Sequence, residues 1–153
     1  MTALERDDAE FLAVAIEQAR TGAAEGGVPI GGALVADGVV LGAGRNRRMQ
    51  RGSPIHHGET DALEQAGRQA ASVYAKATMY TTLSPCDMCS GAMLLYKIPR
   101  VVVGENRTFL GAEDLLRDRG VEVIVADDER CIQLMRTFIA GHPQEWNEDI
   151  GEP

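Results

Sequence analysis

Two short segments of the sequence carry side chains that bind metal ions. The first is His57-Gly58-Glu59, and the second is the Pro-Cys-Asp-Met-Cys run at residues 85–89. Cys86 and Cys89 are three residues apart, so at the start of a helix both sulfur atoms face the same side of the first turn. The free N–H groups and the dipole of that turn favour thiolates, the form of cysteine that binds metal.

These side chains fit a catalytic zinc site better than a structural one. A structural zinc site is closed by four protein ligands, whereas His57, Cys86 and Cys89 would leave the fourth position of one Zn²⁺ per chain to water or hydroxide. Glu59 follows the histidine by two residues, so its carboxylate can stand beside that water without binding the metal. There it can take the water's proton and return it to a ring nitrogen and a leaving amine. The combined H-x-E…P-C-x-x-C pattern is that of zinc deaminases that act on nucleobases.

Each part of this pattern alone has other interpretations. A C-x-x-C pair also occurs in thiol redox sites and in structural zinc sites, and an isolated H-x-E carries almost no information. The order of the two motifs favours a catalytic zinc. The remaining candidates are assigned other roles: His56 is expected to point away from His57, Cys131 to be a small buried hydrophobe, and His142 to be an exposed helix cap.

The composition indicates an ordinary globular protein that acts on a small molecule. The chain has 153 residues, 44% of them hydrophobic and 25% charged, which is enough for one domain, residues 1–153, with its own core. No apolar run approaches the ~20 residues of a membrane span, and residues 1–10 lack the order of a secretory signal. With three cysteines, two of them in the C-x-x-C pair, we expect a cytoplasmic protein with reduced thiols.

The net charge of −8 argues against a nucleic-acid partner, because such proteins usually present a basic face to the phosphates. The exception is a cluster of four arginines, Arg45, Arg47, Arg48 and Arg51. It is interpreted as a solvated turn or a surface facing acidic residues in preference to an RNA-binding patch.

The elements that position the motifs are expected to alternate between helices and strands. Helices are predicted at residues 3–24, 57–66, 86–96, 113–118 and 127–140, and strands at residues 30–35, 39–43, 77–83, 101–103 and 121–125. Asp37-Gly38 predicts a hairpin between the first two strands. The last two strands are short β-branched runs separated by a helix, which indicates a parallel crossover in a sheet buried on both faces. The predicted fold is an α/β/α three-layer sandwich on a mixed five-stranded sheet.

The flanking residues identify a family. The chain resembles the zinc-dependent cytidine/deoxycytidylate deaminases, and within them the fungal type that acts on free cytosine. The likeness runs from about Phe11 to Glu152 and includes residues 26–32, 81–89, 102–106, 125–131 and the tail from Trp146. It implies the family's fold and homodimer.

The resemblance also implies a role for each matching position. Asn46 and the backbone N–H of Gly58 would hydrogen-bond the ring of the base. The backbone carbonyl of Ser84 and the carboxylate of Asp149 would receive the amine that is expelled. Ile30, Phe109 and Trp146 would form the walls of the pocket, and residues 144–153 would form a lid over it.

One departure from the fungal pattern leaves the substrate open. Met49 stands where those enzymes have a phenylalanine that lines the pocket, and methionine offers no fixed stacking face. The predicted reaction is cytosine plus water to uracil plus ammonia. The alternatives are deamination of another small cyclic amidine such as creatinine or isocytosine, a tRNA adenosine deaminase, and a non-catalytic zinc module.

Overall fold

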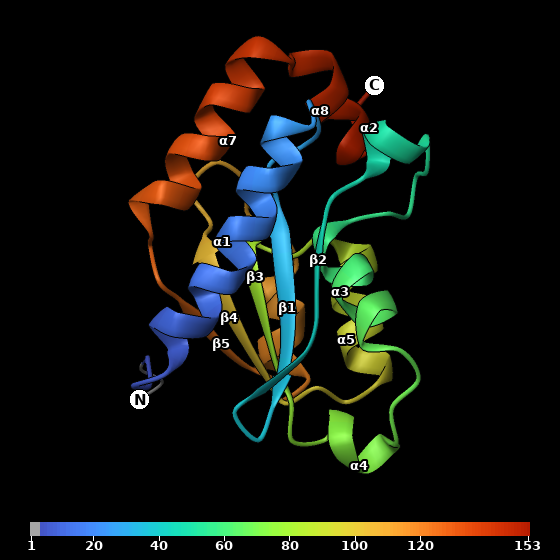
Figure 1. The fold of residues 1–153 in the computed structure, drawn as a ribbon, viewed down its shortest axis with the longest axis vertical. Coiled ribbons are helices and arrows are strands. Elements are labelled where there is room, and N and C mark those ends of the chain that lie inside the picture. Colours follow the sequence, from blue (N-terminus) through green and yellow to red (C-terminus); the bar gives the residue numbers. More distant parts are fainter. Residues whose placement is uncertain (1–3) are drawn as a thin grey trace.

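The computed structural model describes residues 4–153, and the strands of this part of the chain form one mixed sheet in the order β2-β1-β3-β4-β5 (Figure 1). The strands are β1 (Gly31–Ala36), β2 (Val39–Arg45), β3 (Thr78–Leu83), β4 (Arg100–Glu105) and β5 (Glu122–Val125). The helices are α1 (Asp8–Ala24), α2 (Arg48–Arg51), α3 (Gly58–Ala66), α4 (Ala71–Tyr74), α5 (Asp87–Leu95), α6 (Glu113–Asp118), α7 (Glu129–Gly141) and α8 (Pro143–Asp149). β1 pairs antiparallel with β2 and β3, while β3-β4 and β4-β5 are parallel. The predicted mixed five-stranded sheet and its parallel crossover are confirmed.

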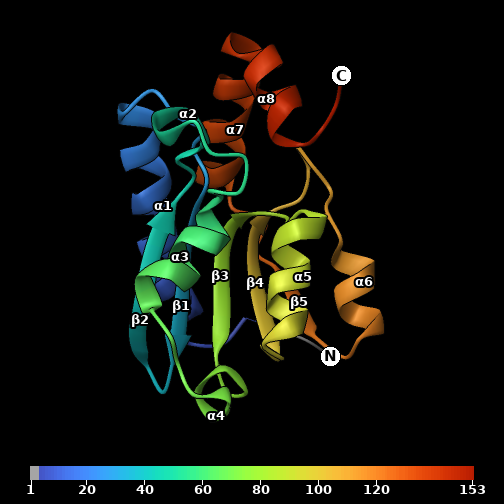
Figure 2. The same cartoon turned by 90° about the vertical axis from the view of Figure 1, so that its right-hand side faces the viewer.

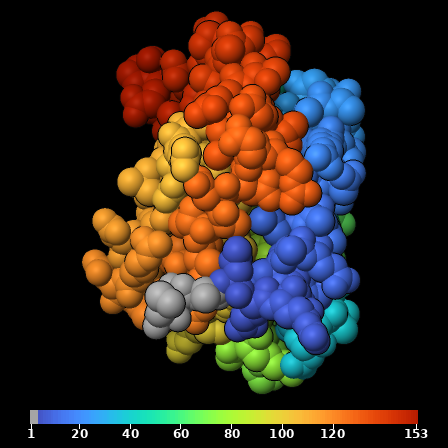
Figure 3. All heavy atoms as spheres, turned by 90° about the vertical axis from the view of Figure 1, so that its left-hand side faces the viewer, coloured from blue at the N-terminus to red at the C-terminus, as the bar shows by residue number. Residues whose placement is uncertain are grey.

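Helices cover both faces of the sheet. Helices α1 and α7 lie on one face, and α3, α5 and α6 lie on the other (Figure 2). In Figure 3 the side chains of α1 and α7 fill the first of these faces. The predicted three-layer sandwich is therefore confirmed.

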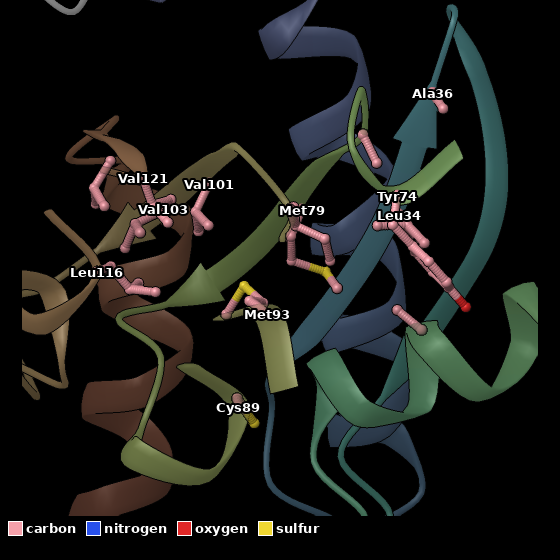
Figure 4. Close-up of a cluster of buried hydrophobic side chains, with 14 residues drawn as sticks. Leu34, Ala36, Tyr74, Met79, Cys89, Met93, Val101, Val103, Leu116 and Val121 are labelled. Carbon is pink, nitrogen blue, oxygen red and sulfur yellow. The ribbon is translucent and has the colours of Figure 1, made fainter. Parts of the chain in front are cut away.

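The core follows from the alternation of side chains along the central strands. On β4, Val101 and Val103 belong to the cluster beneath α5 and α6, while Val102 belongs to the cluster beneath α1 and α7. Figure 4 shows Met93 of α5 and Leu116 of α6 packed in the first cluster. Burying one such side chain stabilises the fold by roughly 1.5–3 kcal/mol, which explains why β-branched runs form these strands. Cys131 lies in the second cluster, as expected for a small hydrophobe.

The segments that carry the predicted site residues meet at one edge of the sheet. The carboxyl ends of the parallel strands β3 and β4 lie at this edge, where Leu83 pairs with Glu105. β1 runs the opposite way to β3 and so begins there, and β2 ends there, with Gly31 opposite Arg45. Ligand sites of α/β sheets form where loops leave the carboxyl ends of strands.

Two helix starts differ from the predictions by more than one residue. The first helix begins at Asp8, not at residue 3, which lies outside the described residues. The Asp8 carboxylate accepts the Glu5 N–H at 2.6 Å and pairs with Arg100 of β4, so the chain turns before the helix begins. The helix predicted from residue 127 begins at Glu129, because Asp127 has a left-handed φ of 55° and Asp128 caps the helix through the Arg130 N–H.

The sequence prediction also omitted the short helices α2, α4 and α8. Helices of one or two turns are too short to show a hydrophobic period. α8 begins at Pro143, whose fixed φ suits a first helical position. The expected lid segment is therefore largely helical.

Candidate active site

The first predicted motif lies at the start of α3. His57 is the N-cap residue, and its N–H donates to the Thr60 hydroxyl at 3.0 Å, which fixes the backbone at this point. The start of α3 approaches β1 closely: a Cβ atom on Gly32 would lie 2.9 Å from the Gly58 carbonyl oxygen. Glycine at position 32 therefore lets the helix bring His57 and Glu59 to the edge of the sheet.

The second motif lies at the start of α5, as predicted. Cys86 is the N-cap residue of this helix and Cys89 lies in its first turn. The Nδ1 atom of His57 is 3.5 Å from Cys86 Sγ and 3.6 Å from Cys89 Sγ. Two helix N-termini thus bring the candidate ligand His57 together with two candidate cysteine ligands that lie 29 and 32 residues further along the chain.

The spacing of these three atoms fits zinc. With Zn–N of about 2.0 Å and Zn–S of about 2.3 Å, tetrahedral geometry separates nitrogen from sulfur by about 3.5 Å, close to the 3.5 and 3.6 Å found here. The Nε2 atom of His57 lies 3.3 Å from the Asp149 carboxylate, without the geometry of a hydrogen bond. A carboxylate behind a metal-binding histidine fixes its ring orientation and raises its basicity.

The electrostatics of the three ligands also favour a bound cation. A hydrogen bond from the Cys89 thiol, assisted by His57, lowers the pKa of Cys86 to about 4. The neighbouring Cys86 thiolate, together with burial, raises the pKa of Cys89. Burial would lower the pKa of His57, but Asp149 and Cys86 outweigh it and raise the pKa to about 10. Without a metal ion, a proton on His57 balances the negative charges of Cys86 and Asp149. A bound Zn²⁺ would take the place of that proton.

Glu59 has the environment of a proton-transfer group. Its side chain is buried, with 4% of the residue exposed, and lines the same cavity as His57 and Cys86. Burial, together with the negative charge of Cys86, raises the pKa of Glu59 to about 7. A carboxyl group with a pKa near neutrality can both accept and donate a proton at physiological pH.

The cavity beside these residues brings together most of the predicted site. Its lining comprises Ile30, His57, Glu59, Leu83, Ser84, Cys86, Phe109, Trp146, Asp149 and Ile150. The rings of Phe109 and Trp146 meet edge to face, with centroids 5.7 Å apart. The cavity offers only about 10 Å³ to the centre of a water-sized sphere. A larger groove of about 570 Å³ lies between α1 and α7, but it contains none of the predicted site residues.

Asn46 and Gly58 lie just behind this lining. Asn46 is fully buried, and its Nδ2 group donates to Asp149 Oδ1 at 3.0 Å. Gly58 is buried as the first residue of α3, between the ligand His57 and Glu59. The structure thus gathers both residues around the predicted ligands.

Met49 does not reach the cavity. It lies on the one-turn helix α2, which has no buried residue, and 39% of its surface is exposed. The prediction that Met49 lines the pocket is therefore not met by this structure. The reason is that the chain turns into α2 directly after Asn46, which carries the next residues away from the sheet edge.

Sequence reasoning missed two wall residues and the groups that hold Ser84. Leu83 ends β3 beside Ser84, and Ile150 follows Asp149, so proximity to predicted residues was the available signal. The Ser84 hydroxyl donates to the buried Glu113 carboxylate at 2.6 Å and accepts the Gly111 N–H at 2.9 Å. These contacts fix the residue whose carbonyl was predicted to meet the substrate.

Two of the four arginines of the cluster pair with acidic residues of the same chain. Arg45 forms a two-point contact with Glu25 at 2.9 Å, and Arg47 Nε lies 3.5 Å from Asp61. Arg48 donates to the Pro54 carbonyl at 3.1 Å. These partners agree with the interpretation of a turn that faces acidic residues.

A buried glutamate beside an open His-Cys-Cys site, at the carboxyl edge of a three-layer sandwich, defines a zinc-dependent hydrolytic deaminase. The comparisons with known proteins agree. Residues 5–105 match the cytidine and deoxycytidylate deaminase zinc-binding region, and the chain belongs to this family.

Curated relatives cover almost all of the chain. It is 54% identical over 147 residues to a cytosine deaminase of Candida albicans, covering 95% of this chain and 98% of that protein. It is 32% identical over 140 residues to a tRNA-specific adenosine deaminase of Streptococcus pyogenes, covering 84% and 87%. Among solved structures, the guanine deaminase from Nitrosomonas europaea shares 22% identity at a TM-score of 0.68, over 91% of this chain and 87% of that one. At this identity the likeness shows the fold alone.

Proposed function

We propose that this protein is a zinc-dependent hydrolytic deaminase that converts free cytosine and water into uracil and ammonia. The observation that carries the proposal is the placement of Glu59 in a closed cavity with His57 and Cys86, in a chain 54% identical to a cytosine deaminase. One Zn²⁺ per chain, held by His57, Cys86 and Cys89, would supply an acidified water as its fourth ligand. The transfer of protons and the binding of the base are carried out by the protein's own groups.

Glu59 moves the protons of the reaction. It takes one proton of the attacking water and delivers it to the ring nitrogen next to the amine-bearing carbon. It then takes the remaining hydroxyl proton and passes it to the departing amine, so that one proton of water ends on uracil and the other on ammonia. The raised pKa of about 7 suits a group that must alternate between the two forms. Its burial excludes solvent that would otherwise compete for the proton.

The remaining residues bind and orient the base. Asn46 and the Gly58 N–H would contact the ring, while the Ser84 carbonyl and Asp149 would accept the amine N–H groups. Ile30, Phe109 and Trp146 would hold the ring by packing. The hydrogen bond of Asn46 to Asp149 and the contacts of Ser84 with Glu113 and Gly111 preorganise these polar groups before a base enters.

The structure supports a lid formed by the C-terminal segment, residues 144–153. Trp146, Asp149 and Ile150 line the cavity from α8 and its end. A cavity of about 10 Å³ has room for about one water molecule, so a base can enter only when part of the wall moves, and the lid proposal assigns this movement to the C-terminal segment. A ribose or polynucleotide attached to the base would have to pass through the same closed wall, which favours a free base.

We also propose that the protein is a cytoplasmic homodimer. Five of the exposed apolar side chains belong to the adjacent helices α5 and α6 or to residues next to them, a surface that a second copy would cover. They are Met88, Leu95, Tyr96, Leu110 and Leu115. All three cysteines are unpaired, which suits a reducing compartment. Among residues 4–153, no helix is both long and apolar enough to cross a membrane.

The rival substrates have less support. The suggestion of creatinine or isocytosine rested on Met49 in the pocket wall, and Met49 lies outside it. A tRNA substrate would need basic groups free to bind phosphates, yet Arg45 and Arg47 are paired with Glu25 and Asp61.

An ammonia-release assay tests the proposal. Zinc-loaded protein should act on cytosine in preference to cytidine, adenine, guanine, creatinine and isocytosine. The matched control is Glu59→Ala, which should keep zinc and the fold while losing at least about 10²-fold in turnover, because Glu59 moves protons without binding the metal. Preferred turnover of another compound, or near-normal turnover by Glu59→Ala, would contradict the proposal.

A further inference from the structure

Asp61 is a buried carboxylate that the proposed reaction does not use. It lies on α3 two residues after Glu59, with 1% of its surface exposed. Its Oδ2 atom accepts the Arg45 N–H at 2.9 Å and lies 3.5 Å from Arg47 Nε. Its Oδ1 atom contacts His56 Nε2 at 2.9 Å and accepts a hydrogen bond from Gln65 Nε2 at 3.3 Å.

The partners of Asp61 flank the residues of the active site. Arg45 and Arg47 stand on either side of Asn46, and His56 precedes the predicted zinc ligand His57. The Arg47 N–H also donates to the His56 carbonyl at 3.0 Å, so the two segments are joined directly. One carboxylate therefore anchors the substrate-binding segment and the metal-binding segment to the same turn of α3.

The carboxylate is ionised, which strengthens these contacts. Burial alone would raise the pKa of Asp61, but hydrogen bonds from the Arg45 N–H, Gln65 and His56 hold it below its usual 3.8. Hydrogen bonds to a charged group are shorter and stronger than those between neutral groups.

A second metal site is the competing interpretation of this cluster. His56, Asp61 and Glu64 place their ligand atoms within 4.8 Å of one another. However, both Asp61 oxygens already face donors, and one faces the guanidinium of Arg47. A cation next to that guanidinium would be repelled, so the cluster is better explained as a support for the neighbouring segments.

We infer that Asp61 is a positioning residue that fixes Asn46 relative to Glu59 and His57. The inference rests on the proposed function, in which Asn46 contacts the base. Asn46 is itself tied to Ile30 by a backbone hydrogen bond of 2.9 Å and to the lid through Asp149. If Asp61 is changed, the backbone before Asn46 loses a hydrogen bond and the Arg47 side chain after it loses its charge partner, so the Asn46 amide shifts within the pocket.

The test is a double-mutant cycle of Asp61→Asn with Asn46→Ala. Asparagine keeps the size of the side chain but loses the charge and one acceptor oxygen. In the wild-type background Asp61→Asn should lower kcat/KM for cytosine about 10-fold while zinc content stays the same. In the Asn46→Ala background the same change should lower kcat/KM by less than about threefold, because the side chain through which Asp61 acts has already been removed. Equal losses in the two backgrounds, or no loss in either, would overturn the inference.

A spectroscopic measurement separates this inference from the proposed function. The side-chain amide of Asn46, assigned by its absence in Asn46→Ala, should shift in the NMR spectrum of Asp61→Asn. It should not shift in the control Asp128→Asn, the same substitution at the N-cap of α7, where the carboxylate bonds Arg130. Lack of cytosine turnover by the wild type would refute the proposed substrate, whereas an unmoved Asn46 amide would refute the role of Asp61. If Asp61→Asn does not fold, His56→Ala removes one contact of the same carboxylate and should give a smaller effect with the same coupling to Asn46.

Discussion

Trp146 is the residue through which α8 closes the active-site cavity, so Trp146→Ala gives a quantitative test of the lid. The residue is 5% exposed and belongs to a cluster with Ile30 and Leu83 of the sheet edge and Phe138 of α7. Its ring also meets Phe109 edge to face at 5.7 Å. Trp146 is the only residue of α8 among the buried hydrophobic side chains of this cluster.

The expected magnitude follows from this burial. Replacing a buried tryptophan by alanine costs about 3–5 kcal/mol, of which the aromatic pair accounts for about 0.5–1.5 kcal/mol. Because α8 lies outside the sheet and is held by this ring together with the Asn46–Asp149 hydrogen bond, most of the loss should fall on the closing of α8 and little on the unfolding of the sheet. Since 1.4 kcal/mol corresponds to a factor of ten, the open form should become about 10²- to 10³-fold more populated.

Amide hydrogen exchange measures this population directly. The Ile150 and Glu152 amides, which donate to Trp146 and Asn147 carbonyls, should exchange at least about 10²-fold faster in Trp146→Ala, while amides of β4 keep their protection. kcat/KM for cytosine should fall at least about 10-fold, because the open form neither excludes water nor places Asp149. Trp146→Phe keeps an aromatic ring in the cavity wall, so its exchange rates and its kcat/KM should lie between those of the wild type and those of Trp146→Ala.

Two results would refute this reasoning. If the α8 amides keep their protection in Trp146→Ala, the ring does not hold the segment closed. If the amides of β4 lose protection by the same factor as those of α8, the segment unfolds together with the core and is no independent lid.

The remaining predictions concern the metal, the core and the specificity. Cys86→Ala should lose both zinc, as measured by metal analysis, and activity. A chelator should lower the Tm of the wild type in thermal unfolding but leave the Tm of this variant unchanged. Zinc retained by Cys86→Ala would refute the role of Cys86 as a ligand. Asp8→Asn should destabilise the fold by about 3 kcal/mol, because the buried Asp8 carboxylate accepts from Arg100 at 2.6 Å and from Tyr80 at 2.6 Å. Burial opposes this ionisation, but those partners hold the pKa of Asp8 below 3.8, so its contribution is present above that pH and is lost as the pH falls through the folded-state pKa. A difference in denaturant stability between wild type and variant that stayed constant down to pH 2 would contradict this assignment. Met49→Phe should leave the substrate profile unchanged, since Met49 lies on the exposed face of α2; a shifted profile would show that it reaches the base.

Local patterns were sufficient to single out the candidate metal-binding residues, which the structure brings together, and to predict most of the strands. Cys86 and Cys89 are held together by one helical turn, and His57 and Glu59 by another, so their relative positions follow from short-range geometry. The buried strands were evident because β-branched runs such as residues 101–103 suit a sheet covered on both faces. The alternation of these strands with helices then limits the topology to a few arrangements.

Only the tertiary structure decided how the distant segments meet. Asn46 and Asp149 are 103 residues apart and share one hydrogen bond, which no local period could reveal. Resemblance placed Met49 in the pocket, but the turn into α2 carries it to the surface. The role of Asp61 was also invisible, because a lone aspartate on a helix resembles a solvated charge until Arg45, Arg47 and His56 are seen around it. Sequence periodicity reports which side of an element faces the core, whereas the pairing of buried polar groups depends on how the elements pack against one another.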